Sequence, residues 1–160
     1  MRHEKSMKMY NLLFPIWLIF IFPIFWLIVL PVNFFIDLGV LFLSLIYLKI
    51  DNKKEIIKKS VLRIWILGFI ADFIGVAMMY VLMQPYNDWW NHHISYPLNF
   101  NPFESVYALF FTTCCVIVSA YFIYRFNYKI CLQKTSLNKK QKKIIALFFA
   151  VFTAPYFFYL

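Results

Sequence analysis

The sequence predicts an all-α integral membrane protein with five transmembrane helices, a cytoplasmic N-terminus and an outside C-terminus. Of the 160 residues, 63% are hydrophobic and only 14% are charged, whereas about 25% are charged in a typical soluble domain. The apolar residues form runs long enough to cross the roughly 30 Å hydrocarbon core of a bilayer. These two observations exclude a soluble enzyme, a disordered chain and a small secreted domain held by disulfides.

The apolar run from 11 to 48 is too long for a single membrane crossing. As one helix it would be about 57 Å long, at 1.5 Å per residue. Pro31 to Asn33 offers a break, because proline cannot continue the helical hydrogen-bond ladder and asparagine favours turns. We therefore predict two spans, at about 11–31 and 33–48, joined as a tight hairpin.

The rest of the chain alternates between polar segments and apolar spans, and the whole chain, 1–160, is predicted to form a single membrane domain. The remaining predicted elements are a cytoplasmic loop at 49–63, a span at about 64–83, an outer loop at 84–103, a span at about 104–124, a cytoplasmic loop at 125–143 and a final span at about 144–160. Loop 49–63 has the pattern of an amphipathic helix at the headgroups.

The positions of the basic residues predict the orientation. Segments 1–10, 49–63 and 125–143 hold three, six and seven Lys or Arg residues, which are all 16 in the chain. With five spans and the N-terminus inside, every one of them lies on the cytoplasmic side, as the positive-inside rule requires. We expect contact with anionic lipid headgroups there and no binding of nucleic acid. Lys outnumbers Arg 13 to 3, which is typical of an AT-rich bacterial genome. We therefore expect the plasma (inner) membrane of a bacterium as the location.

Two carboxylates fall inside predicted spans, Asp37 and Asp72. A charged aspartate at the bilayer centre costs about 2.5–3.5 kcal/mol even on the lenient insertion scale, so both must face protein or water, or be protonated. Other polar residues share helix faces with them. The predicted candidates for a ligand site or an ion pathway are Asn33, Asp37, Ser44, Asp72, Thr112 and Cys115.

Counting residues from the span ends predicts the depth of these candidates. One layer near the middle of the membrane is predicted to contain Ser44, Asp72, Thr112 and Cys115. Asp37 is predicted to lie nearer the outer surface. Asp72 would then be an ion or proton site, or a protonated group that bonds Ser44 or Thr112 and holds the bundle together. Asp37 would either stabilise a second helix capped by Asn33 or line an outward-facing pocket.

Small residues predict where the spans touch. Gly68 and Gly75 share a face with Asp72 in the third span, and Ser119 shares a face with Thr112 in the fourth. Such faces let membrane helices approach closely. We therefore expect the second, third and fourth spans, with the fifth, to form the bundle interior, and the first span to be peripheral.

The outer loop holds a second group of polar and aromatic residues. The outer-face candidates are Asp88, Trp89, Trp90, His92, His93 and Glu104. Some are metal ligands by type, but no zinc-binding spacing is present, so we predict no metal site and an interfacial loop anchored by its tryptophans. There is no nucleophile motif, no phosphate-binding loop and no CxxC pair, so we predict no catalytic residues and no cofactor.

Three kinds of function stay open at this point. The first is a non-enzymatic role, as an accessory subunit, a protective protein or a binder of a small ligand. The second is an ion- or proton-coupled transporter or channel that uses Asp37 and Asp72. The third is a membrane enzyme that acts at the outer face. A homo-oligomer or a complex with another membrane protein is compatible with all three.

Overall fold

Residues 23–84 and 86–159 are described by a computed structural model, and every regular element in them is helical. The elements in chain order are α2 (Pro23–Tyr47), α3 (Lys53–Leu82), α4 (Asp88–Trp90), the π-helix η1 (Asn91–Ser95), α5 (Tyr96–Phe100), the 3-10 helix η2 (Pro102–Glu104), α6 (Val106–Phe126), the π-helix η3 (Asn127–Cys131), α7 (Lys139–Phe152) and the 3-10 helix η4 (Tyr156–Tyr159). The predicted all-α class is confirmed.

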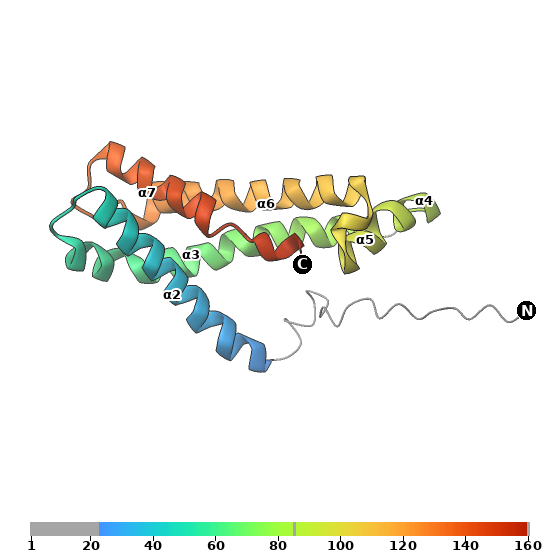
Figure 1. Ribbon diagram of the computed structural model, residues 1–160, viewed down its shortest axis with the longest axis horizontal. Coiled ribbons are helices and arrows are strands. Elements are labelled where there is room, and N and C mark those ends of the chain that lie inside the picture. Colours follow the sequence, from blue (N-terminus) through green and yellow to red (C-terminus); the bar gives the residue numbers. More distant parts are fainter. Residues whose placement is uncertain (1–22, 85, 160) are drawn as a thin grey trace, which may run out of the picture.

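Four segments of the described residues are long and apolar enough to cross a membrane. They are Leu27–Tyr47, Lys53–Leu82, Val106–Cys131 and Lys139–Tyr159. α3 and α6 lie side by side along the long axis of the molecule, and α7 packs against α6 (Figure 1). α2 crosses the bundle at an angle, so that its first turns diverge from α3. The α2–α3 and α6–α7 connections lie at one end, and α4 and α5 lie at the other.

The predicted hairpin at Pro31 to Asn33 is wrong, because α2 runs through Pro31 without a break. Proline is tolerated in membrane helices where neighbouring groups bond the backbone around it. Here the Trp65 indole of α3 donates a hydrogen bond of 3.1 Å to the carbonyl of Leu30, beside the proline. The predicted span 33–48 is therefore the second half of α2. Of the predicted span 11–31, the part from 11 to 22 lies outside the described residues.

The turn that ends α2 is made instead by Lys49. Its φ of 52° is in the left-handed region, and the Ile50 and Lys49 amides donate to the carbonyls of Leu45 and Ile46. This pair of bonds is a Schellman motif, which satisfies the last carbonyls of a helix and reverses the chain. α3 then begins after three residues, at Lys53.

The two predicted cytoplasmic loops are largely helical. Residues 53–63 are the first turns of α3 and carry an ion pair between Lys59 and Glu55. Residues 139–143 are the start of α7, which Asn138 and Gln141 begin with a reciprocal capping box. The segment between α3 and α6, predicted as a loop, is also mostly helical. The predicted boundaries marked the edges of apolar composition, whereas the helices continue into the charged sequence beyond.

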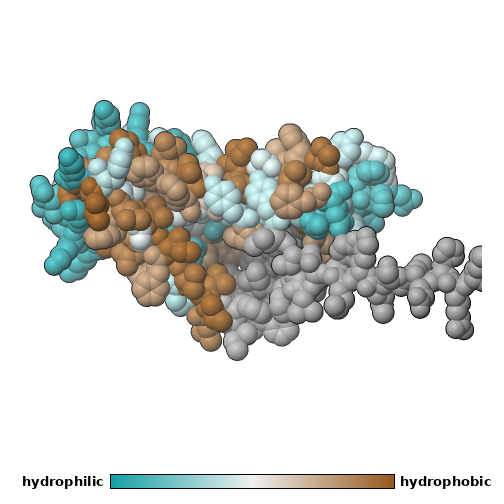
Figure 2. All heavy atoms as spheres, viewed as in Figure 1, coloured by the Kyte–Doolittle hydropathy of each residue, from teal (hydrophilic) through white to brown (hydrophobic). Residues whose placement is uncertain are grey.

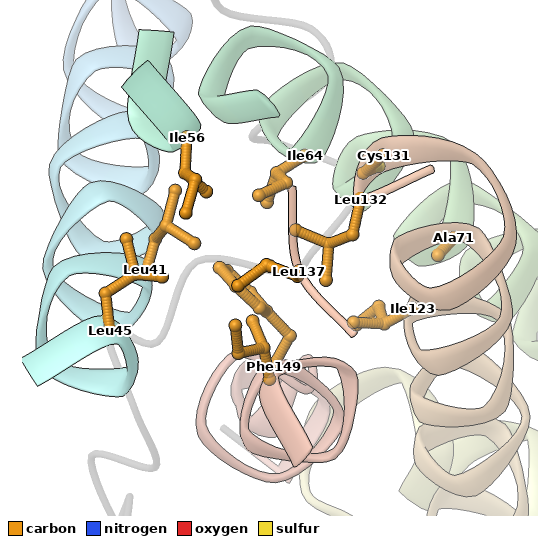
Figure 3. Packing of buried hydrophobic residues seen from close by; sticks show 11 residues of the cluster. Leu41, Leu45, Ile56, Ile64, Ala71, Ile123, Cys131, Leu132, Leu137 and Phe149 are labelled. Carbon is orange, nitrogen blue, oxygen red and sulfur yellow. The ribbon is translucent and has the colours of Figure 1, made fainter. Parts of the chain in front are cut away.

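The hydrophobic core near the basic end joins all four long helices. Figure 3 shows side chains from α2, α3, α6 and α7 pointing toward one another. The buried members of this cluster are Leu41, Leu45, Ile56, Ile64, Ala71, Ile123, Cys131, Leu132, Leu137, Ile145 and Phe149. Because this core forms at the end where α2 meets the bundle, it leaves the first turns of α2 free to diverge.

The surface has the character of a membrane protein. Many large apolar side chains are exposed along the sides of the helices, such as Phe35 at 67% and Phe110 at 63%. Figure 2 shows hydrophobic residues over the middle of the visible face and hydrophilic residues toward the two ends. Every Lys and Arg of the described residues lies between 49 and 63 or between 125 and 143, at the end where α2 turns into α3.

Candidate functional site

A cavity of about 450 Å³ lies between α2, α3 and the C-terminal segment. Its lining residues are Ile28, Val29, Val32, Asn33 and Ile36 from α2, Phe69, Asp72, Phe73 and Val76 from α3, and 152–157 from the end of α7 and the start of η4. Almost all of these side chains are apolar. The cavity occupies the angle that opens where α2 diverges from α3.

The C-terminal wall of the cavity is a break in a helix. α7 ends at Phe152, and Pro155, which cannot continue a helix, precedes η4. The Val151 carbonyl, which Pro155 cannot bond, accepts a hydrogen bond of 2.6 Å from the Tyr156 hydroxyl. The Phe149 carbonyl accepts from both the Thr153 amide, at 2.9 Å, and the Thr153 hydroxyl, at 2.8 Å. The bend turns the chain so that residues 152–157 face α2 and α3 across the cavity.

A notch at Gly75 holds this wall in place. Gly75 of α3 faces Ser119 of α6, and the ring of Phe158 enters beside them: a Cβ at Gly75 would overlap Ser119 Oγ and lie 2.9 Å from Phe158 Cε2. Phe158 is fully buried. The next residue, Tyr159, donates a hydrogen bond of 3.0 Å from its hydroxyl to Thr113 Oγ1. Gly75 and Ser119 both lie on the small-residue faces that were predicted to allow close approach of the helices.

Asp72 is the one acidic residue among the described residues that line the cavity, and no Lys, Arg or His lines it. Its Oδ1 atom is enclosed and has no hydrogen-bond partner among the described residues. The ion pair Lys59–Glu55 is the one salt bridge in the described part of the chain, so no basic side chain within 23–84 or 86–159 pairs with Asp72. Burial of a charged carboxylate here is unfavourable, because the apolar side chains around it displace water and offer no hydrogen-bond donor in its place.

Asp37 lies close to Asp72 but outside the cavity. It is only 4% exposed, and its Oδ2 lies 3.8 Å from the position that a Cβ would take at Gly68, one turn before Asp72 on α3. The Asp37 carboxylate therefore lies about one helical turn from Asp72 along α3. The predicted depth of Asp37, nearer the outer surface, is wrong, because α2 begins well before Asn33. For the same reason Asn33 caps no helix; it lines the cavity within α2.

The predicted mid-membrane layer is not formed. The Gly75–Ser119 contact fixes the register of α3 against α6. At 1.5 Å per residue along antiparallel helices, Thr112 lies about 15 Å and Cys115 about 10 Å from the level of Asp72. Ser44 is similarly displaced, toward the basic end, and its hydroxyl donates to the Val40 carbonyl of its own helix. Of the predicted pathway residues, Asn33, Asp37 and Asp72 come together.

The outer-face candidates form a separate group at the far end of the molecule. Asp88, Trp89, His92 and Glu104 are exposed. His93 stacks on Trp89 at 4.7 Å between ring centroids, and the Trp90 indole donates to the Leu82 carbonyl at 3.0 Å. No group of three potential metal ligands is present within the described residues. None of these six residues lines the cavity.

The C-terminal lining residues, 152–157, were not predicted as part of a site. The signal in the sequence is Pro155, which lies inside the predicted fifth span and marks a break at membrane depth. No family model, no curated protein and no solved structure matches this chain. Function is therefore inferred below from the cavity, its walls and its charge.

Proposed function

We propose that this chain is a non-enzymatic protein of the plasma membrane that binds a small lipophilic molecule between α2, α3 and the C-terminal segment. The observation that carries the proposal is the cavity of about 450 Å³. Binding sites for small molecules are typically concave and apolar, have volumes of about 300–1,000 Å³, and contain a few placed polar groups. Asp72, Asn33, Thr153 and Tyr156 are the polar residues in a wall that is otherwise apolar.

The broken helix supports the same proposal. Irregular backbone at membrane depth is tolerated only where it is buried in protein or lines a cavity. The bend at 153–155 lines this cavity.

The distribution of charge supports an orientation with the basic end in the cytoplasm. The described residues place all their Lys and Arg at that end, where anionic headgroups would bind them. The proposal keeps a cytoplasmic N-terminus, because segment 1–10 carries three further basic residues. Since α2 is one continuous helix from Pro23, the fifth crossing of this proposal lies in the residues before α2 and not in a hairpin at 31–33. The cavity then lies in the half of the membrane away from the cytoplasm.

The test is photolabelling of the full-length protein, purified in a mild detergent, with the neutral lipophilic probe adamantane diazirine. We expect labelling that saturates with probe concentration and maps by peptide mass spectrometry to segments 28–36, 69–76 and 152–157. Val32→Trp should reduce it several-fold by filling the cavity. Val32 is 51% exposed, so the larger side chain has room to be accommodated without unfolding.

Leu43→Trp is the matched control. Leu43 is on the same helix, is 65% exposed and does not line the cavity, so this variant should label like the wild type. Labelling that never saturates, or that spreads evenly over the lipid-facing surface, would refute the proposal. Saturable labelling that is unchanged in Val32→Trp would place the binding site elsewhere and refute it as well.

A further inference from the structure

We propose that the molecule bound in the cavity is a lipophilic cation: a hydrophobic body that carries a protonated amine or an onium group, with its charge against Asp72. This inference rests on the proposed function, since it names the chemical class of ligand for the same cavity. Three features of the described residues carry it: an uncompensated carboxylate, a second carboxylate beside it, and aromatic side chains in the walls.

The first feature is the state of Asp72. It lines the cavity, its Oδ1 is enclosed without a hydrogen-bond partner among the described residues, and no salt bridge of the described chain involves it. A cationic group would stabilise the Asp72 carboxylate more than a neutral hydroxyl would, because charge-assisted hydrogen bonds are about twice as strong as neutral ones. A cationic group on the ligand is the complement that the site lacks.

The second feature is Asp37 on the facing helix. Its carboxylate lies beside Gly68, one turn from Asp72 on α3. The nearest basic residue along α3 is Arg63, about 13 Å from Asp72 along the helix axis. Among the described residues, the charged groups nearest to Asp72 are therefore acidic. Their field disfavours an anionic ligand and favours a cation over a neutral molecule of the same shape.

The third feature is the aromatic content of the walls. Phe73, Phe152 and Phe157 line the cavity together with Tyr156. Aromatic faces attract cations, most strongly where water is excluded, and cages of this kind recognise onium groups. The same rings supply dispersion contacts for the hydrophobic body of the ligand. The charge of Asp72 and the apolar walls together therefore favour a ligand that has both a cationic group and a hydrophobic body.

The test is competition for the saturable diazirine labelling by two ions of the same size and shape, tetraphenylphosphonium and tetraphenylborate. Each competitor is titrated against wild type and Asp72→Asn, an isosteric variant that removes the charge. The two ions partition differently into detergent, so their half-inhibition concentrations cannot be compared directly. The reference is therefore the ratio of the two half-inhibition concentrations in Asp72→Asn. We expect wild type to favour the phosphonium by about tenfold more than this reference.

Asp88→Asn, at an exposed residue of the outer segment, is the matched control and should keep the wild-type ratio. An equal ratio in wild type and Asp72→Asn would refute the cationic class while saturable labelling still supported a lipophilic site. Absence of saturable labelling would instead refute the proposed function itself. Equal loss of preference in Asp88→Asn and Asp72→Asn would show a general charge effect and would also overturn the inference.

Discussion

At the residue scale, Gly75 has the tightest surroundings of the three glycines. A Cβ there would overlap Ser119 Oγ and press against the Phe158 ring, whereas a Cβ at Gly39 would meet nothing within 4 Å. Overpacking of this kind costs about 1–3 kcal/mol. We therefore expect Gly75→Ala to lower the free energy of unfolding by that amount, as a lower midpoint of thermal unfolding in detergent.

Gly39→Ala is the matched control, and it should leave the midpoint unchanged or raise it, because alanine is the better helix former. Adding Ser119→Ala to Gly75→Ala should recover part of the loss by removing the overlapping hydroxyl. If Gly75→Ala unfolds at the wild-type temperature, the notch does not hold the C-terminal wall in the way described.

At the scale of elements, the two prolines within apolar sequence, Pro31 and Pro155, have opposite roles. Pro31 lies inside α2, so Pro31→Ala should restore a backbone donor and raise the free energy of unfolding, by up to about 3 kcal/mol. Pro155→Ala should lower it, because a continued α7 would draw Phe158 out of its notch. Circular dichroism during thermal unfolding in detergent measures both. A Pro31→Ala variant that unfolds at or below the wild-type temperature would contradict this account of α2.

The difference between these prolines explains how far the sequence can predict the fold. The helical class and the small-residue faces of α3 and α6 follow from composition and spacing, which are local properties. Whether a proline breaks a helix depends on the groups that bond the backbone around it. The Trp65 indole of α3 bonds the Leu30 carbonyl beside Pro31, whereas the Tyr156 hydroxyl bonds the Val151 carbonyl that Pro155 leaves free. The first of these partners is 35 residues away in the chain, so a local pattern cannot reveal it.

The candidate site shows the same limit. Asn33, Asp37 and Asp72 were found because polar residues in apolar spans are conspicuous. Their grouping with Thr112 and Cys115 failed because residue counting assumed that the outer ends of α3 and α6 are level. The outer segment packs beside the first turns of α6, and α6 therefore extends past the end of α3. That offset is set by tertiary packing and is invisible to counting.

At the scale of the whole molecule, cysteine labelling in intact cells tests the orientation. In a background with Cys114, Cys115 and Cys131 changed to Ala, Asn91→Cys should react with a membrane-impermeant maleimide. Ser136→Cys should react only after permeabilisation. Both positions are exposed, so accessibility within the protein does not confound the result. The opposite pattern would reverse the orientation. Labelling of Ser6→Cys from outside would contradict the fifth span.

The position of Asp72 along α3 also determines how a ligand would reach the cavity. Asp72 is ten residues from the end of α3, or about 15 Å, and lining residues such as Val32, Phe73 and Phe152 are exposed on the sides of the helices. A molecule that enters between them comes from the lipid phase. Its occupancy then follows its mole fraction in the bilayer, so a weakly binding but strongly partitioning compound can saturate the site at a low aqueous concentration.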